Sequence, residues 1–262
     1  MVKKFDCIFL HKSGGKMSPN PNLITPDYII EWCKNRQTKN FNLRPKYRMK
    51  VLELFSGTGS VKKICDEYGF DCVSIDIDDK FHPVDIKADI LTWDYKIYKP
   101  GDFDIIWASP PCATFSSLLP IRKTKEQIIE LMNNIGLPLL NRAREIIDYL
   151  KPDYYFIENP KTGRMKDYIT DLPYHDVTYC HYGFTTFKPT RIWTNLDSFE
   201  PKYCRKGSYC NQKVNNKHPG KIGMTRSTPN GKFGISNIGN KTKLAEKYAI
   251  PPDLIRSIFN SI

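Results

Sequence analysis

The stretch LELFSGTGS, residues 52–60, decides the fold. It joins an apolar run, residues 50–55, to a segment with helical spacing, residues 60–68. Gly57 and Gly59 allow a tight turn and let the backbone approach a ligand closely. We therefore predict a buried strand, a glycine turn and a helix, with a binding site at the carboxyl end of the strand. A glycine turn that serves only the strand-to-helix geometry is the alternative.

Apolar strands alternate with amphipathic helices along the rest of residues 48–262. The expected strands cover 50–55, 70–76, 103–108 and 154–158, and a hairpin pair is expected at 177–179 and 191–194. The expected helices cover 60–68 and 126–150, and a closing helix within 243–262 starts near Pro251. Pro138 is expected to bend or break the second helix. This alternation predicts an α/β fold with a doubly wound, mainly parallel sheet.

The charge divides the chain into a nearly neutral middle and two basic flanks. Residues 1–47 carry nine Lys and Arg against three acids, and residues 200–262 carry twelve against three. We interpret residues 1–47 as a basic N-terminal extension and residues 48–262 as one folded domain. Within that domain, residues 200–242 form a small, basic, loop-rich insert. The excess of positive charge favours a polyanionic partner, although basic segments can also serve solubility alone.

Composition excludes several classes of protein. The chain has 262 residues, a formal charge of +12 and 40% hydrophobic residues, which is typical of a globular protein. It contains no apolar run near the roughly 20 residues of a membrane span. The apolar stretch near the N-terminus is too short for a secretory signal. Eight cysteines are scattered along the chain, so we expect an intracellular, reducing compartment.

Asp76 ends the second expected strand, where an acid can accept hydrogen bonds from ribose hydroxyls. The glycine turn lacks the third glycine of the dinucleotide pattern, and it lacks a phosphate-binding Lys-Ser/Thr pair. A nucleoside without a pyrophosphate therefore fits better, and S-adenosylmethionine is the leading candidate for the cofactor.

Two more motifs follow expected strands and should meet at the same sheet edge. In WASPPCATFSS, residues 107–117, the two prolines hold Cys112 in one direction, and a cysteine thiolate is a strong nucleophile. A buried structural cysteine is the alternative. In FIENP, residues 156–160, Glu158 lies at the rim of the sheet, where a carboxylate can also be a helix cap or an ion-pair partner.

The motifs FSGTGS, SPPC, ENP and YG…PTRIW, in this order and spacing, resemble the DNA cytosine-5 methyltransferase family. The likeness is greatest to the compact enzymes of phages and large DNA viruses, and it covers about residues 50–262. It implies a Rossmann-like fold and methyl transfer from S-adenosylmethionine to C5 of cytosine in DNA. It also implies that Cys112 attacks C6 of a flipped-out base, that Glu158 holds the base, and that Arg191 helps to fix the base and the nucleophile.

The resemblance also implies the cofactor contacts and the partner. The cofactor-binding residues are expected to be Phe55, Ser56, Gly57, Thr58, Gly59, Asp76, Ile77, Asp89, Ile90 and Pro111. Residues 113–125 would form a loop that closes over the substrate. We expect a monomer that acts on duplex DNA. The short insert at 200–242 implies recognition of few bases.

The insert also contains Cys204, Cys210 and His218, spaced C-x5-C-x7-H. Zinc needs four ligands, and the sequence shows no evident fourth, although Cys180 or His181 could come close in space. We therefore expect no metal site. The basic residues of the insert are interpreted as contacts to phosphates, which position a protein without reading sequence. They are Lys202, Arg205, Lys206, Lys213, Lys217, Lys221 and Arg226.

Three other functions remain open. A tRNA cytosine-5 methyltransferase would use the same chemistry on another polymer. A methyltransferase that acts on an exocyclic nitrogen would need an aromatic residue where Cys112 stands. A non-catalytic protein that binds nucleic acid could use a decayed methyltransferase fold.

Overall fold

The computed structural model of the chain describes residues 48–205, 210–213, 218, 245 and 248–262. The N-terminal extension expected at residues 1–47 and most of the insert expected at 200–242 lie outside these described residues. In the part of the chain that is described, no helix is long and apolar enough to cross a membrane.

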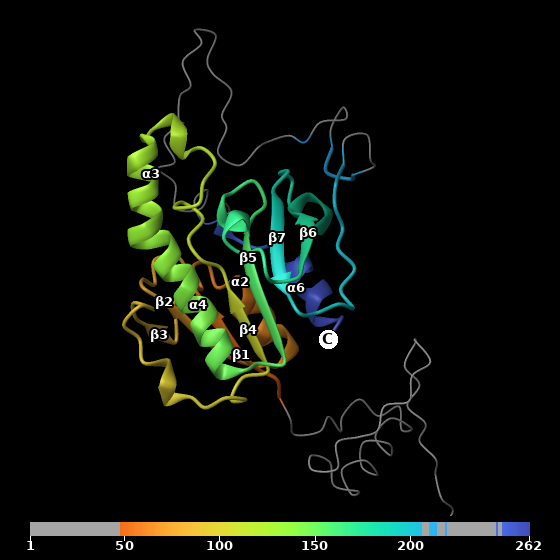
Figure 1. Cartoon of the computed structure of the whole chain (residues 1–262). Helices are drawn as coiled ribbons and strands as arrows, with labels where there is room; N and C mark the ends of the chain where they lie inside the picture. The colour runs from red at the N-terminus through yellow and green to blue at the C-terminus, as the bar shows by residue number, and fades with distance from the viewer. Residues whose placement is uncertain (1–47, 206–209, 214–217, 219–244, 246–247) are drawn as a thin grey trace, which may run out of the picture. The chain divides into compact units, whose positions relative to one another are not determined.

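A seven-stranded sheet in the order β3-β2-β1-β4-β5-β7-β6 forms the centre of the domain (Figure 1). Its strands are β1 Lys50–Leu54, β2 Asp71–Asp76, β3 Ile86–Lys87, β4 Ile105–Ala108, β5 Tyr154–Pro160, β6 Tyr174–Thr178 and β7 Pro189–Thr194. The pairs among β1 to β5 are parallel, and β7 runs antiparallel to both β5 and β6. The strand order reverses between β1 and β4, where such sheets bind their ligands.

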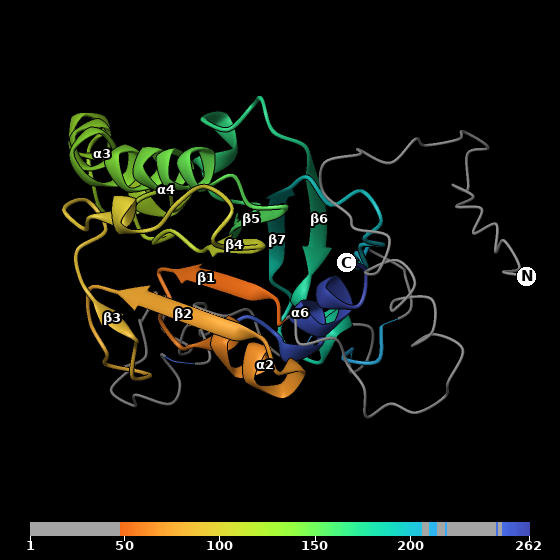
Figure 2. The same cartoon turned by 90° about the horizontal axis from the view of Figure 1, so that it is seen from below.

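Helices cover both faces of the sheet, as Figure 2 shows. On one face α2 (Ser60–Tyr68) and α6 (Pro252–Phe259) pack on alternate strand residues, among them Val51 and Phe156. On the other face α4 (Leu137–Leu150) packs on the residues between them, such as Leu52. The expected α/β, doubly wound, mainly parallel architecture is confirmed.

The helix expected over residues 126–150 is interrupted, but not at Pro138 itself. It consists of α3 (Lys125–Leu131) and α4, joined by a π-helical turn, Met132–Gly136. Pro138 lies in the first turn of α4, directly after this π-helical turn, and has no N–H to donate to the helical residues before it. The π-helical turn Met132–Gly136 is wider than a turn of α-helix, and the irregularity of the helix lies there.

The resemblance implies a third strand before Asp89, but its range cannot be located from the sequence, because the two residues of β3 are too few to show a hydrophobic period. The hairpin pair expected at 177–179 and 191–194 is confirmed as β6 and β7, each of them longer than predicted. The closing helix is confirmed as α6, which begins at Pro252.

Candidate functional site

The glycine turn after β1 is a strained segment held by its neighbours. Phe55, Gly57 and Gly59 all have positive φ angles, of 58°, 54° and 63°. A non-glycine residue such as Phe55 in this region costs on the order of 1 kcal/mol or more, and it persists where the surrounding structure imposes it. The backbone N–H of Gly57 donates a 2.8 Å hydrogen bond to Oδ2 of Asp76. The turn and the acid that ends β2 are therefore joined directly.

Glu53 is a buried acid beside the glycine turn that the sequence reasoning missed. It lies buried in β1, and its carboxylate accepts hydrogen bonds from the backbone N–H groups of Val61 and Lys62, at 3.1 Å each. The hydroxyl of Ser56 donates to the same carboxylate at 3.0 Å. Burial raises the pKa of Glu53 to about 7, against the effect of these hydrogen bonds. The sequence signal that could have identified Glu53 is an acid inside an apolar strand that leads into a glycine turn.

Several of the predicted cofactor residues build the turn itself. The side chains of Ser56 and Thr58 are buried, and Thr58 shares a 2.8 Å hydrogen bond with the hydroxyl of Ser60. A Cβ on Gly59 would come within 2.6 Å of the His82 ring, so the position has no room for a side chain. These residues shape the backbone around the cofactor position.

The other predicted cofactor residues lie at or near the carboxyl edge of the sheet. Ile77 is 66% exposed directly after Asp76, and Pro111 is exposed after β4. Asp89 is half-buried after β3, and its Oδ1 accepts a hydrogen bond from the N–H of Leu91. The side chain of Ile90, by contrast, lies in the apolar core.

These residues fit S-adenosylmethionine. The carboxylate of Asp76 accepts hydrogen bonds from Gly57 and Asp78, and carboxylate oxygens have lone pairs left for ribose hydroxyls. The exposed Ile77 side chain offers an apolar surface beside that carboxylate, suited to a flat base. The backbone of the glycine turn, which a ligand can approach closely, forms the remaining side of the expected cofactor site.

The loop that carries Cys112 is tied to β5. Nδ2 of the buried Asn159 donates a 2.9 Å hydrogen bond to the carbonyl oxygen of Pro110, two residues before Cys112. Farther along the loop, the N–H of Arg164 donates to the carbonyl oxygen of Phe115 at 2.7 Å. The loop that carries the half-buried Cys112 is therefore anchored to β5 at Asn159.

Glu158 has an aromatic partner instead of a cation. The hydroxyl of Tyr179 donates a 2.7 Å hydrogen bond to Oε1 of Glu158, and both side chains are buried. Burial, followed by the charge of Glu158 and the hydrogen bond to it, holds the pKa of Tyr179 well above its ordinary value. Tyr179 therefore stays protonated and donates. The nearby cations Lys161 and Arg191 pair with Asp176 instead of Glu158.

Arg191 is not brought to Glu158. In the register of β5 and β7, Arg191 pairs with Asn159, one residue beyond Glu158, so the two side chains leave opposite faces of the sheet. Arg191 donates from Nε and Nη2 to Asp176, at 2.8 and 3.1 Å, and lies over the Tyr174 ring. The predicted contact of Arg191 with the base is not supported by this placement, because the side chain is engaged in the ion pair.

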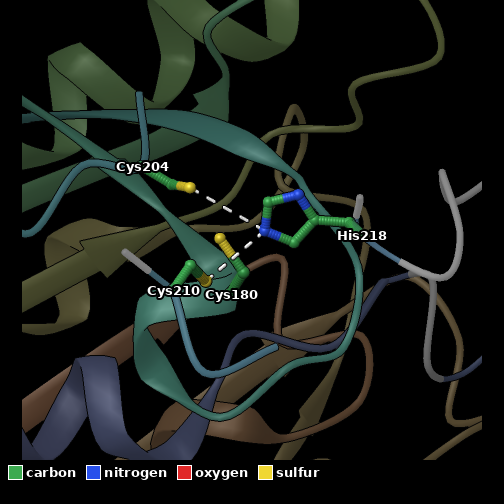
Figure 3. A group of neighbouring side chains, drawn as sticks. All are labelled: Cys180, Cys204, Cys210 and His218. Atoms are coloured by element: carbon green, nitrogen blue, oxygen red, sulfur yellow. Dashed lines mark hydrogen bonds between the residues drawn. The ribbon is translucent and has the colours of Figure 1, made fainter. Parts of the chain in front are cut away.

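A second cluster lies on the segment that follows β6 and the segment that follows β7. The Sγ atoms of Cys180, Cys204 and Cys210 and a ring nitrogen of His218 lie within 4.8 Å of one another (Figure 3). The fourth residue, which the spacing of the other three did not reveal, is Cys180 and not His181. Although the sequence reasoning expected no metal site, the fold brings four potential ligands together.

The fold and the first site together define a class of protein. A doubly wound sheet carries a glycine turn, an acid after β2 and a cysteine after β4 at one carboxyl edge. This is a Rossmann-like methyltransferase with S-adenosylmethionine as its methyl donor.

Comparison with known proteins specifies the family. Residues 49–167 match the family model for C-5 cytosine-specific DNA methylase. A probable DNA (cytosine-5)-methyltransferase of Frog virus 3 (isolate Goorha) is 41% identical over 215 residues, which cover 79% of this chain and 97% of the viral protein. The chain belongs to the C-5 cytosine-specific DNA methylase family, and it is an enzyme.

Solved structures are more distant. The methyltransferase EhMeth of Entamoeba histolytica is 14% identical with a TM-score of 0.45, over 61% of this chain and 58% of that one. A DNMT2 mutant of Spodoptera frugiperda is 19% identical with a TM-score of 0.39, over 60% and 54% of the two chains. This chain therefore spans less than two thirds of either structure.

Proposed function

We propose that this enzyme methylates C5 of cytosine in duplex DNA through a covalent bond between Cys112 and C6 of the base. The observation that carries the proposal is that the loop bearing Cys112 is hydrogen-bonded to Asn159, the neighbour of Glu158, whose carboxylate is held by the buried Tyr179. S-adenosylmethionine supplies the methyl group.

The chemistry of cytosine requires a nucleophile in this position. C5 is a poor nucleophile, and addition of the Cys112 thiolate to C6 makes C5 electron-rich. Glu158 holds the base through N3 and the exocyclic amine, and it favours protonation at N3 during the addition. After C5 has taken the methyl group, a base removes the C5 proton, and the bond between Cys112 and C6 breaks to release the thiolate.

The target base must leave the DNA stack for this reaction. C6 of a stacked cytosine is out of reach of a half-buried thiol, so the base is flipped out of the duplex. We further propose that residues 113–125 close over the flipped base. Leu118 and Ile121 in this segment are 51% and 76% exposed, which gives the segment apolar side chains to bury on closure.

The basic flanks are assigned to the DNA backbone. Residues 1–47 and the insert at 200–242 carry the excess positive charge, and contacts to phosphates position a protein without specifying sequence. The shortness of the insert supports recognition of few bases. We propose that the enzyme works as a monomer inside cells, where its cysteines stay reduced.

The test is transfer of labelled methyl groups to duplex DNA that carries 5-fluorocytosine at candidate sites. Fluorine at C5 blocks the elimination step, so we expect a denaturant-stable adduct on Cys112. Cys112→Ala should abolish methyl transfer and the adduct while the variant still binds S-adenosylmethionine. Cys72→Ser, which changes a half-buried thiol on β2, is the matched control.

Each alternative function has its own outcome in this experiment. Label on tRNA but not on DNA would show the RNA methyltransferase. N4-methylcytosine as the product would show exocyclic-nitrogen chemistry, and residual activity of Cys112→Ala would refute the covalent mechanism. Cofactor binding without transfer to either polymer would leave a nucleic-acid-binding protein.

A further inference from the structure

The cluster of Cys180, Cys204, Cys210 and His218 is outside the machinery proposed above. Cys180 lies in a 3-10 turn, Tyr179–Tyr182, directly after β6. The other three residues lie beyond β7, so segments far apart in the sequence meet here. Figure 3 shows the three sulfur atoms and the imidazole pointing toward a common centre.

The distances match the edges of a tetrahedral metal site. Nε2 of His218 lies 3.4 Å from Sγ of Cys210 and 3.8 Å from Sγ of Cys204. Tetrahedral zinc, with Zn–S bonds of about 2.3 Å and Zn–N bonds of about 2.0–2.1 Å, places its sulfur and nitrogen ligands roughly 3.5 Å apart. One ion can therefore be reached by all four ligand atoms with only small side-chain adjustments.

Ordinary core packing does not account for this cluster. The three cysteines are only 2–7% exposed, and among the described residues the partly buried apolar neighbour packed against them is Phe187, whose ring lies 5.4 Å from that of His218. None of the three cysteines forms a disulfide. Three buried thiols around one imidazole form the ligand set of a closed Cys3His zinc site, which leaves no position open for a substrate.

The protein backbone around the cluster is already held in place. The N–H of Cys204 donates a 2.8 Å hydrogen bond to the hydroxyl of Thr178, and the N–H of Thr178 donates to the carbonyl oxygen of Lys202. The N–H of Lys202 in turn donates to the hydroxyl of Tyr182. These bonds fix two of the cysteines before any ion binds, and such support around the ligands is typical of metal sites.

We propose that Cys180, Cys204, Cys210 and His218 bind one structural zinc ion. The ion joins the start of the basic insert to the turn after β6. Cys180 directly follows Tyr179, the partner of Glu158, so the metal also stabilises the backbone that positions the catalytic carboxylate. The site is distinct from the methyl-transfer machinery and acts on it through Tyr179.

The test measures metal in the full chain, purified with a reductant and then loaded with zinc and freed of excess. We expect about one zinc ion per chain by elemental analysis. Replacement by cobalt should give the visible absorption of a tetrahedral ion, together with thiolate charge-transfer bands. Neither signal depends on methyl transfer.

Variants link the metal to these residues. Cys204→Ser and His218→Ala should each lower the zinc content at least several-fold, whereas His218→Cys should retain it, because four thiolates also make a zinc site. Cys72→Ser is the control for loss of a thiol elsewhere. If a ligand variant fails to fold, the cobalt spectrum of the unmodified chain still decides the question.

Two results would overturn the proposal. One is a folded, reduced chain that takes up neither zinc nor cobalt. The other is a bound ion whose content and cobalt spectrum are unchanged in Cys204→Ser and His218→Ala.

Discussion

The hydroxyl of Tyr179 donates a 2.7 Å hydrogen bond to Oε1 of Glu158, and both side chains are buried. The two residues are 21 positions apart and come from different elements, η5 (Tyr179–Tyr182) and β5. With one carboxylate oxygen held by the phenol, the orientation of the Glu158 side chain is restricted. In the proposed mechanism, this restriction would let Glu158 bind the base in one fixed pose.

Tyr179→Phe should slow methyl transfer roughly 10- to 100-fold, since a hydrogen bond to a charged group is worth about 1.5–3 kcal/mol. Binding of S-adenosylmethionine should not change. Tyr95→Phe is the matched control, because the Tyr95 hydroxyl makes a similar 2.6 Å bond to Glu145 in α4. Single-turnover rates measured for both variants provide the test, and equal rates for the two would contradict the assigned role.

Asn159→Asp should reduce the rate of adduct formation by Cys112 about tenfold or more. The substitution keeps the shape of the side chain but removes the N–H that Pro110 accepts, and a lost buried hydrogen bond costs about 1–3 kcal/mol. Asn195→Asp is the control, because Asn195 makes a comparable bond to the Asp153 carbonyl before β5 begins. Trapping kinetics with 5-fluorocytosine measure the effect. An unchanged rate in Asn159→Asp would show that this bond does not position Cys112.

Gly59→Ala should destabilise the protein more than Gly69→Ala, by at least about 1 kcal/mol. Both glycines have positive φ, but a Cβ at Gly59 would meet the His82 ring, while a Cβ at Gly69 would have no atom within 4 Å. The free energy of unfolding in urea is measured for both variants. Gly69→Ala reports the backbone strain alone, and the additional loss in Gly59→Ala reports the crowding against His82. His82→Ala should restore part of the loss in Gly59→Ala, and no rescue would argue against crowding.

Asp176→Asn should lower the stability by about 1–3 kcal/mol at neutral pH, between the values for exposed and buried ion pairs. Burial by itself would raise the pKa of Asp176, but hydrogen bonds from Arg191 and Lys161 lower it below the ordinary 3.8. The stabilisation is therefore complete above pH 3.8 and is lost as the pH falls through the lowered pKa. The free energies of unfolding of wild type and variant should differ at pH 7 and become equal in strong acid.

The same pair tests the role of Arg191. If Arg191 acts through Asp176, then Arg191→Ala and Asp176→Asn should have non-additive effects on stability in the double variant. A large loss of methyl transfer in Arg191→Ala alone, with activity intact in Asp176→Asn, would instead support the contact with the base that the sequence predicted.

Affinity for DNA should fall steeply with salt, by about tenfold or more between roughly 50 and 200 mM. The reason is that the basic flanks release counterions from phosphates when they bind. Binding isotherms across this range measure the slope. A flat profile would show that the flanks serve another purpose.

The elements could be predicted from local sequence because their signals are local. Helix α2 begins and ends where predicted, since Gly59 and Gly69 stand directly outside it in left-handed conformations. The glycine turn, the acid after β2 and the cysteine after β4 all follow apolar strands, so parallel pairing alone brings them to one edge. Strand β3 is too short to produce such a pattern.

The sequence by itself thus determined the α/β class, the order of the motifs, and Cys112 and Glu158 as residues of one sheet edge. The tertiary structure alone decided which partners they meet. Side chains alternate between the faces of a strand, so the register of β7 against β5 separates Arg191 from Glu158 and leaves Tyr179 as its partner. The same folding brings Cys180 to Cys204, Cys210 and His218, because residues distant in sequence become neighbours only when the strands have paired.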